Sequence, residues 1–359
     1  MVDRDRGPRA AQRRSRAASQ EREEPAVSQN ITIHDVARQS GVSYQTVSRV
    51  INNHPSVADA TRARVQQAIA QLNYRPSLLA KSLSSRRSGL LGVVAYGTEQ
   101  YGPSQLVQNV QRSARSHDYE VLLVTLREFQ EEAMLEAVAR LGQFGVDGLV
   151  LLAPYDAHAV VRRLGTQVPF ILVDATEDVD GTTVSIDQAG GGAIAAEHLI
   201  GLGHRAVLHI SGPREWSDAE LRYEGYVQTM ARCGLAPLPR FEGDWSPGSG
   251  FAAVRRALES GLSFTALTVG NDQMALGAIA ALRSAGLGVP GDVSVVGFDN
   301  IPEAAYFDPP LTTVAQDFGL LGRKSLEELL RRIAEPASRG RHVIFQPQLV
   351  LRGSTRQVP

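Results

Sequence analysis

From Leu90 onward, short apolar runs alternate with longer stretches in which apolar residues recur at helical spacing. The apolar runs have the length of single buried strands, and their sequences are LLGVVA, EVLLVT, GLVLLA, FILVDA, AVLHIS, ALTVG and VSVVGF. Amphipathic stretches lie between several of them, for example at 104–117, 131–144 and 272–284. Alternating strands and helices at this spacing predict a doubly wound parallel α/β sheet.

The segment before the first predicted strand carries only helical periodicity. Thr32 and Asp35 have the spacing of a capping box at the start of a short helix. Val36 and Ala37 give that helix an apolar face, and Gly41 falls in the turn that follows. This pattern predicts the first half of a helical hairpin.

A second short helix is predicted at 44–52, with Ser43 as its N-cap. Val47 and Val50 lie three residues apart and form its inner face. The side chains that point outward are Tyr44, Gln45, Ser48 and Arg49. Two helices joined in this way form a helix-turn-helix, in which the first turn of the second helix enters the major groove of DNA.

Gln45 and Arg49 have the chemistry to read bases from that helix. A glutamine can form two hydrogen bonds with the edge of adenine, and an arginine can bind O6 and N7 of guanine. Arg49 lies one turn beyond Gln45, so the two side chains can address neighbouring base pairs of one half-site. The alternative is that Tyr44, Gln45 and Arg49 form an ordinary solvated helix face.

A third helix is predicted at 59–72. The apolar residues that recur at helical spacing within it are Val65, Ala68, Ile69 and Leu72. Their stripe completes a small three-helix core, and the helix ends before Pro76, which disfavours helix at the preceding residue. The next segment, 77–83, can form one more short helix, although a helix of that length is marginal in water.

The stretch DVARQSGVSYQTVSRVINNHPSV resembles the N-terminal headpiece of the lactose-repressor (LacI/GalR) family of bacterial transcription regulators. The resemblance implies double-stranded operator DNA as a partner. It assigns DNA contacts to Thr32, Ser43, Tyr44, Gln45, Ser48, Arg49, Asn52 and Leu83. It also implies that 77–88 is a hinge that orders on the operator, with Leu83 wedged between base pairs in the minor groove. The alternative for Leu83 is a loop leucine that packs on the core.

The stretch VGNDQMALGAIAALRSAGLGVPGDVSVVGFDN, followed by PPLTTVAQDF, resembles the core domain of the same family. Together the resemblances span 31–352. They imply an all-α helix-turn-helix headpiece and an α/β core of two doubly wound lobes, like that of periplasmic sugar-binding proteins. The expected parts are a tail at 1–29, a headpiece at 30–76, a hinge at 77–88 and a core at 89–355. The expected lobes are lobe 1, at about 89–187 and 318–345, and lobe 2, at about 188–317 and 346–355.

Polar residues follow several predicted strands, where ligands bind in doubly wound sheets. Asp174, Asn271 and Asp299 lie at such strand ends; the alternative is that residues here, including Asp272, cap the following helices. The family resemblance assigns effector contacts to Pro103, Asp174, Arg222, Trp245, Asn271, Asp299, Gln316 and Phe318. Carboxylate, amide and guanidinium groups pair with hydroxyls, and an indole suits the C–H face of a sugar.

The expected effector is therefore a sugar or glycoside, galactoside-like, that releases the protein from a palindromic operator. The alternative within the same family is a purine or another non-sugar molecule that acts as a corepressor. An arginine among carboxylates can serve to neutralise them, so Arg222 does not by itself indicate an anionic effector.

Basic charge is concentrated near the N-terminal end, whereas the 359-residue chain has a formal net charge of only −1. Between 38 and 87 the basic residues are Arg38, Arg49, Arg62, Arg64, Arg75, Lys81, Arg86 and Arg87, and the acidic residue is Asp59. Such a local excess is typical of phosphate binding. Residues 1–29 are rich in Arg, Glu, Ser and Ala and predict a disordered basic tail.

Several other chemistries are not expected. Cys233 is the only cysteine, which excludes an intrachain disulfide and a thiolate metal cluster. His198 and His204 lack metal-ligand spacing with other candidate ligands. The glycines at 190–192 lack the Lys-Ser/Thr of a phosphate-binding loop, and no serine has a nucleophile-elbow context. We therefore expect no metal, no cofactor and no enzymatic activity.

The sequence has no apolar run of about 18 residues that would span a membrane and no signal peptide. We therefore expect a cytoplasmic protein with no membrane partner. A transport-type sugar-binding protein would have a signal peptide and no helix-turn-helix, and the sequence contradicts both. The chain ends at Pro359 without the leucine-heptad helix that makes family tetramers, so we expect a homodimer.

Overall fold

The computed structural model describes residues 31–51, 54–74, 87–127, 130–152, 163, 168–174 and 181–358. The chain divides into two compact units, Met1–Ser77 and Leu78–Pro359. Three sequence predictions lie outside the described residues: the disordered tail at 1–29, the DNA contact of Asn52, and the short helix at 77–83 with the wedge of Leu83.

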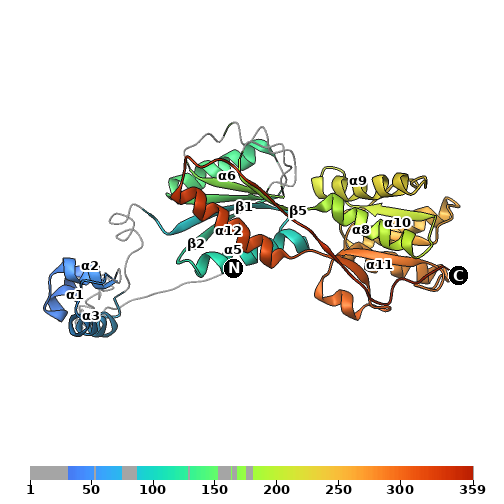
Figure 1. Cartoon of the computed structure of the whole chain (residues 1–359). Helices are drawn as coiled ribbons and strands as arrows, with labels where there is room; N and C mark the ends of the chain where they lie inside the picture. The colour runs from blue at the N-terminus through green and yellow to red at the C-terminus, as the bar shows by residue number, and fades with distance from the viewer. Residues whose placement is uncertain are drawn as a thin grey trace, which may run out of the picture. The chain divides into compact units, whose positions relative to one another are not determined.

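The first unit contains the three predicted helices (Figure 1). They are α1 (Ile33–Ser40), α2 (Tyr44–Ile51) and α3 (Asp59–Gln71). Their buried core consists of Val36, Ala37, Val47, Val50, Val65, Ala68 and Tyr74, with Ile69 and Leu72 half-buried against it. Gly41 follows α1 in the left-handed conformation with φ of 65°, which a glycine adopts without steric cost. The predicted three-helix core is confirmed.

The second unit consists of two lobes, each built on a six-stranded sheet. The sheet of lobe 1 has the order β11-β5-β4-β3-β1-β2, and all of its strand pairs are parallel. Its strands are β1 (Leu90–Tyr96), β2 (Glu120–Leu126), β3 (Gly148–Leu152), β4 (Phe170–Val173), β5 (Thr183–Ile186) and β11 (His342–Phe345). The described helices that pack on it are α5 (Tyr101–Arg115), α6 (Glu131–Gln143) and α12 (Phe318–Ala334).

The sheet of lobe 2 has the order β12-β10-β9-β8-β6-β7. Its strands are β6 (Val207–Ser211), β7 (Phe241–Glu242), β8 (Ala266–Val269), β9 (Ser294–Asp299), β10 (Thr312–Ala315) and β12 (Gln348–Val350), of which β12 is antiparallel to β10. Its helices are α8 (Gln188–Gly201), α9 (Ser217–Arg232), α10 (Pro247–Glu259) and α11 (Asp272–Ser284), with a short 3-10 helix η1 (Pro302–Tyr306).

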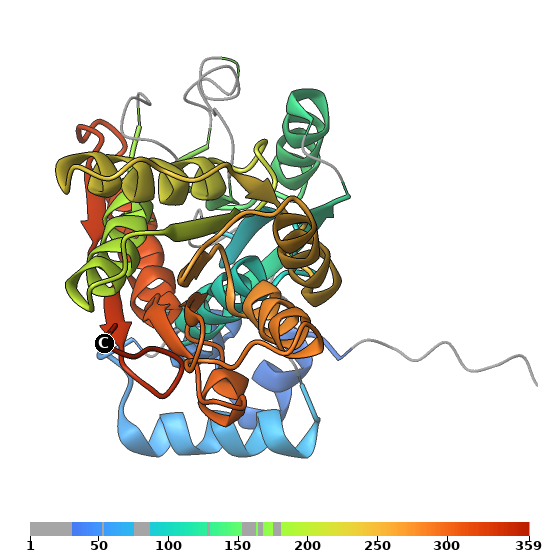
Figure 2. The same cartoon turned by 90° about the vertical axis from the view of Figure 1, so that its right-hand side faces the viewer.

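Helices cover both faces of each sheet, as a doubly wound fold requires. In lobe 1, α5 and α12 pack on one face and α6 packs on the other. In lobe 2, α8 and α9 cover one face, and α10 and α11 cover the other (Figure 2). The central strands β1, β3, β4 and β8 are largely apolar because both of their faces are buried. The predicted fold class is confirmed.

The chain crosses between the two lobes three times. It crosses first from β5 to α8, again from β10 to α12, and finally from β11 to β12. Each lobe is therefore built from separate stretches of sequence. The three crossings bring residues from both lobes to the space between them, where the carboxyl ends of the parallel strands lie.

Glycines allow the backbones of α8 and α9 to approach closely. A Cβ atom on Gly192 would lie 2.1 Å from the backbone oxygen of Arg222, and one on Gly225 would lie 1.9 Å from that of Ala189. The glycines at 190–192, set aside above as a phosphate-binding motif, thus include one that is required for helix packing. Among the described helices, none is long and apolar enough to cross a membrane.

We expect Gly225→Ala to lower the free energy of unfolding by about 1–3 kcal/mol, because the added methyl group overpacks a contact with backbone on both sides. Urea unfolding followed by circular dichroism measures the change. Gly201→Ala is the matched control, since a Cβ on Gly201 meets nothing within 4 Å. Equal midpoints for Gly225→Ala and wild type would contradict the packing role.

Candidate functional site

The outer face of α2 carries the side chains that the sequence assigned to DNA. Ser43, Tyr44, Gln45 and Arg49 are exposed and Ser48 is half-buried, whereas Val47 and Val50 are buried on the opposite face. The backbone N–H of Thr46 donates to Ser43 Oγ at 3.2 Å, so the predicted cap on α2 is confirmed. Thr32 is exposed at the start of α1, where the Asp35 carboxylate accepts from its N–H and its hydroxyl.

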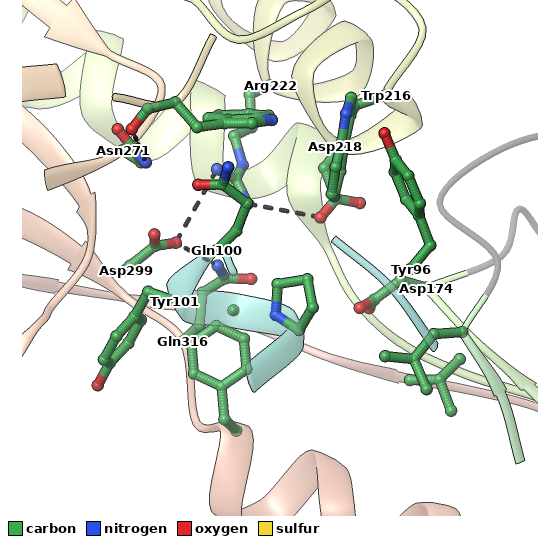
Figure 3. A pocket seen from close by; sticks show the side chains of 16 residues that line it. Tyr96, Gln100, Tyr101, Asp174, Trp216, Asp218, Arg222, Asn271, Asp299 and Gln316 are labelled. Atoms are coloured by element: carbon green, nitrogen blue, oxygen red, sulfur yellow. Dashed lines mark hydrogen bonds and ion pairs between the residues drawn. The ribbon is translucent and has the colours of Figure 1, made fainter. Parts of the chain in front are cut away.

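A cavity lies between the two lobes at the strand ends (Figure 3). Lobe 1 lines it with Tyr96, Gln100, Tyr101, Gly102, Pro103, Leu152, Val173, Asp174 and Phe318. Lobe 2 lines it with Trp216, Asp218, Arg222, Trp245, Asn271 and Asp299, and the crossing after β10 contributes Gln316. All eight residues that the sequence assigned to the effector therefore line one cavity, although their contacts with an effector stay a prediction.

Arg222 is the only basic residue among the described residues that line this cavity. It lies on α9 and is 4% exposed. Its Nε donates to Gln188 Oε1 at 2.8 Å, and its Nη1 donates to the backbone oxygen of Gly270 at 2.5 Å. Its charge faces Asp218 at 3.6 Å and Asp299 at 3.9 Å. A guanidinium buried this deeply requires such partners.

Side-chain contacts link four residues in a closed loop, which we call the polar ring: Arg222, Gln188, Gln316 and Asp299. Gln188 Nε2 donates to Gln316 Oε1 at 2.9 Å, and Gln316 Nε2 donates to Asp299 Oδ1 at 2.7 Å. Burial raises the pKa of Asp299 to about 6, while Arg222 and the bond from Gln316 oppose that rise. Gln188 and Gln316 lie at two of the three crossings, so the ring joins the segments that connect the lobes.

Asn271 holds the start of α11 and a neighbouring loop at the same time. Its Oδ1 accepts from the backbone N–H of Met274 at 2.8 Å, and its Nδ2 donates to the backbone oxygen of Trp245 at 3.1 Å. Trp245 has a φ of 72°, a conformation that is strained for a bulky residue. Asn271 thus fixes the loop that brings the indole of Trp245 into the cavity.

The possibility that Asp272 caps α11 is wrong, because Asn271 is the N-cap. The Asp272 carboxylate instead accepts from the hydroxyl of Thr313 at 2.6 Å and from the backbone N–H of Ile301 at 2.8 Å. Burial and the nearby carboxylate of Asp299 raise its pKa to about 8. Asp272 therefore supports the strand ends from behind rather than lining the cavity.

Eight further residues that line the same cavity were not assigned to the effector from the sequence, and Asp218, Tyr96, Trp216 and Tyr101 are among them. Asp218 lies on α9 four residues before Arg222, so helical spacing from Arg222 would have placed both on one face. Tyr96 is the last residue of β1, at the edge where ligands bind. Trp216 is the N-cap of α9 and Tyr101 is the first residue of α5, and the positions of both side chains depend on tertiary packing.

The two histidines that the sequence set aside as metal ligands have structural contacts. His198 Nε2 lies 3.0 Å from Thr355 Oγ1, and His204 contacts Thr265, Ser294 and the backbone of Arg356. Both histidines therefore hold the C-terminal segment against lobe 2. Within the part of the chain that the structure describes, no group of three potential ligand residues could hold a metal ion.

We expect Asn271→Ala to lower the free energy of unfolding by about 0.5–2 kcal/mol, because α11 loses its cap. Asn271→Ser retains a capping oxygen and lacks the amide that holds Trp245, so it should recover most of that loss. Thermal and urea unfolding of both variants measure the difference. Equal destabilisation by serine and alanine would show that the contact with Trp245, and not the cap, dominates.

Two family descriptions match the chain: "Bacterial regulatory proteins, lacI family" over residues 32–77, and "Periplasmic binding protein-like domain" over residues 196–355. The lactose operon repressor of Escherichia coli K12 is 36% identical over 316 residues, which cover 88% of each chain. The ribose operon repressor of the same strain is 37% identical over 329 residues, which cover 90% of this chain and 99% of that protein.

A solved structure gives the same result in three dimensions. The lac repressor dimer bound to operator and the anti-inducer ONPF matches with a TM-score of 0.85 at 36% identity, covering 91% of this chain and 99% of that chain. The match extends through both the helix-turn-helix region and the two-lobed core, as the sequence predicted. The chain belongs to the LacI family of bacterial regulatory proteins.

Proposed function

We propose that this protein is a transcription repressor that binds a palindromic operator as a homodimer and leaves it when a sugar or glycoside enters the cavity between the lobes. It acts as a regulator on chromosomal DNA in the bacterial cytoplasm and not as an enzyme. The observation that carries the proposal is the cavity itself, in which hydrogen-bonding groups and aromatic faces from both lobes converge. Carbohydrates require both kinds of group.

The distribution of side chains between the two faces of α2 supports the proposed binding of DNA. Val47 and Val50 anchor the helix in the three-helix core, which leaves Gln45 and Arg49 exposed on the other face. These are side chains that can form paired hydrogen bonds with adenine and guanine. The relatives named above are operon repressors, which supports the same role here.

The sugar half is supported by the chemistry of the cavity. Asp174, Asp299 and Asn271 offer acceptors or donors for hydroxyl groups, and Arg222 balances part of their charge. The Trp245 ring is 6% exposed, and its Nε1 has no hydrogen-bond partner among the described residues. A hydroxyl or ring oxygen of a bound sugar would supply that partner.

The position of the cavity supports a switch. A ligand that contacts Asp174 on lobe 1 and Arg222, Asn271 or Asp299 on lobe 2 favours one relative orientation of the lobes. Such differential affinity is what allows a ligand to shift a conformational equilibrium. In a dimer, the lobe orientation would determine the spacing of the two hinges at 77–88 and therefore of the two headpieces.

We expect Arg49→Ala to cost about 1–3 kcal/mol of operator binding at a single base pair and to relax specificity there. Fluorescence anisotropy on operators with each base substituted in turn gives the change by position. Arg255→Ala removes the same charge from an exposed helix of the core and is the control. Equal losses on operator and random DNA would contradict base reading by Arg49.

We expect at least one sugar or glycoside to release the protein from its operator. The experiment titrates a preformed operator complex with sugars, their methyl glycosides and nucleobases, and follows the anisotropy of labelled DNA. The proposal predicts weaker operator binding in the presence of a sugar. A nucleobase that tightens operator binding, with no effect from any sugar, would identify a corepressor and overturn the sugar assignment.

A further inference from the structure

We propose that the effector carries a protonated amine, as an aminated sugar does, and that Asp174 and Asp218 bind this ammonium group beside the rings of Tyr96 and Trp216. The inference rests on the proposed function and names the class of sugar that the same cavity takes. The proposed function by itself does not require a charged effector. Four observations point to one.

The first observation is the imbalance of charge. Among the described residues, the cavity lining contains the carboxyl groups of Asp174, Asp218 and Asp299, against the guanidinium of Arg222. One positive charge does not balance three carboxylates in a partly desolvated site. Buried carboxylates that lack a counter-charge are costly and take up a proton more readily, so a cation from the ligand can take the place of that proton here.

The second observation is that the carboxyl groups of Asp174 and Asp218 are incompletely paired. Among the described residues, the Oδ1 atom of each is buried and has no hydrogen-bond partner. Asp218 faces Arg222 only through Oδ2, at 3.6 Å, and its side chain is 17% exposed. An ammonium group has three donors and can satisfy both orphaned oxygens at once.

The third observation is that Arg222 forms no hydrogen bond with either orphaned oxygen. Its Nε donates to Gln188 and its Nη1 to the backbone oxygen of Gly270, and its Nη2 lies 3.6 Å from Oδ2 of Asp218. Its Nη1 also lies 3.9 Å from Asp299 Oδ1, and its guanidinium carbon lies 3.9 Å from the centre of the Phe298 ring. The guanidinium thus lies between Asp299 and Asp218 (Figure 3), and Oδ1 of Asp174 and Oδ1 of Asp218 keep no partner among the described residues.

The fourth observation is that aromatic rings line the cavity beside Asp174 and Asp218. The ring centres of Tyr96 and Trp216 lie 5.1 Å apart, and those of Trp216 and Trp245 lie 5.8 Å apart in an edge arrangement. Figure 3 shows Tyr96 and Trp216 on the same side of the cavity as Asp218 and Asp174. Aromatic faces attract cations, and rings combined with carboxylates are a recurrent arrangement for alkylammonium ligands.

A neighbouring cavity reaches Asp174 and Asp218 as well. The described residues that line it are Asp174, Ser185, Ile186, Asp187, Gln188, Ala189, Asp218, Leu221, Ile344 and Gln346. They include no lysine and no arginine, and they add the carboxylate of Asp187, which caps α8 through the N–H of Gly190. The described residues of this second cavity therefore do not neutralise Asp174 and Asp218 either.

The inference also specifies how binding depends on pH. Burial raises the pKa of Asp174 and of Asp218; each carboxyl faces the other and Arg222, and Asp299 and Asp187 lie on the two flanking sides. Protons compete with the ammonium group for these carboxylates. The affinity for an aminated sugar should therefore fall as the pH falls through the raised pKa values, whereas that of its neutral parent should change little.

The test compares matched ligands by isothermal titration calorimetry. The probes are methyl glucosides and galactosides with a hydroxyl, an amine or an acetamide at C2, C3, C4 or C6. We expect at least one aminated member to bind tenfold or more tighter than both its hydroxyl parent and its acetamide. If no aminated member exceeds its hydroxyl parent, the inference is overturned. In that case, release of the operator by a neutral hydroxyl sugar would still support the proposed function.

Variants identify the residues that give the preference. Asp174→Asn and Asp218→Asn remove one charge each with little change in shape, and each should reduce the preference for the aminated sugar at least fivefold. Glu224→Gln, at an exposed position on the same helix as Asp218, is the control and should retain it. Operator binding and thermal unfolding show that each variant is folded. An undiminished preference in both asparagine variants would overturn the assignment.

Discussion

The buried guanidinium of Arg222 is the interaction on which the rest of the effector cavity depends. A charge that is 4% exposed must be paired. Arg222 is held directly by Gln188, Asp299 and the oxygen of Gly270, and Gln316 supports it indirectly through its bonds with Gln188 and Asp299. Gln188 and Gln316 come from two crossings between the lobes, Asp299 comes from the end of β9, and the oxygen of Gly270 follows β8. The polar ring therefore ties the strand ends of lobe 2 to the segments that connect the lobes.

This arrangement links the chemistry of the cavity to the geometry of the lobes. A ligand that hydrogen-bonds with Asp299 or Gln316 adds a partner to side chains that already bond with each other, and it can thereby alter the polar ring. Because Gln188 and Gln316 lie at crossings between the lobes, we expect the energy of that change to depend on the lobe orientation. A small molecule can thereby influence a distant hinge without any contact with the headpiece, provided that its affinity differs between the two orientations.

Most of the fold could be predicted from the sequence because both faces of each central strand are buried. The runs that became β1, β3 and β4 are apolar almost throughout, so their type did not depend on distant contacts. Short strands such as β7, β11 and β12 were missed, because two to four residues carry no periodicity and form strands only through their neighbours.

The candidate site was predicted less completely, and the residues explain why. Asp174, Asn271 and Asp299 end predicted strands, so topology alone brought them to one edge. The other assigned residues, such as Trp245 and Gln316, came from the family resemblance. The resemblance did not assign Asp218 or Tyr96. The double role of Asn271 as cap and loop anchor, and the place of Asp272 behind the strand ends, depend on contacts between segments far apart in the chain.

The central claim is that effector binding and operator binding draw on one conformational equilibrium, and reciprocal linkage tests it most directly. The measurement takes the sugar that best releases the operator and determines its affinity by calorimetry, with and without saturating operator DNA. Operator affinity is then determined with and without saturating sugar. The account predicts that both affinities fall by the same factor, as linkage requires. A sugar affinity that operator DNA leaves unchanged or increases would contradict it.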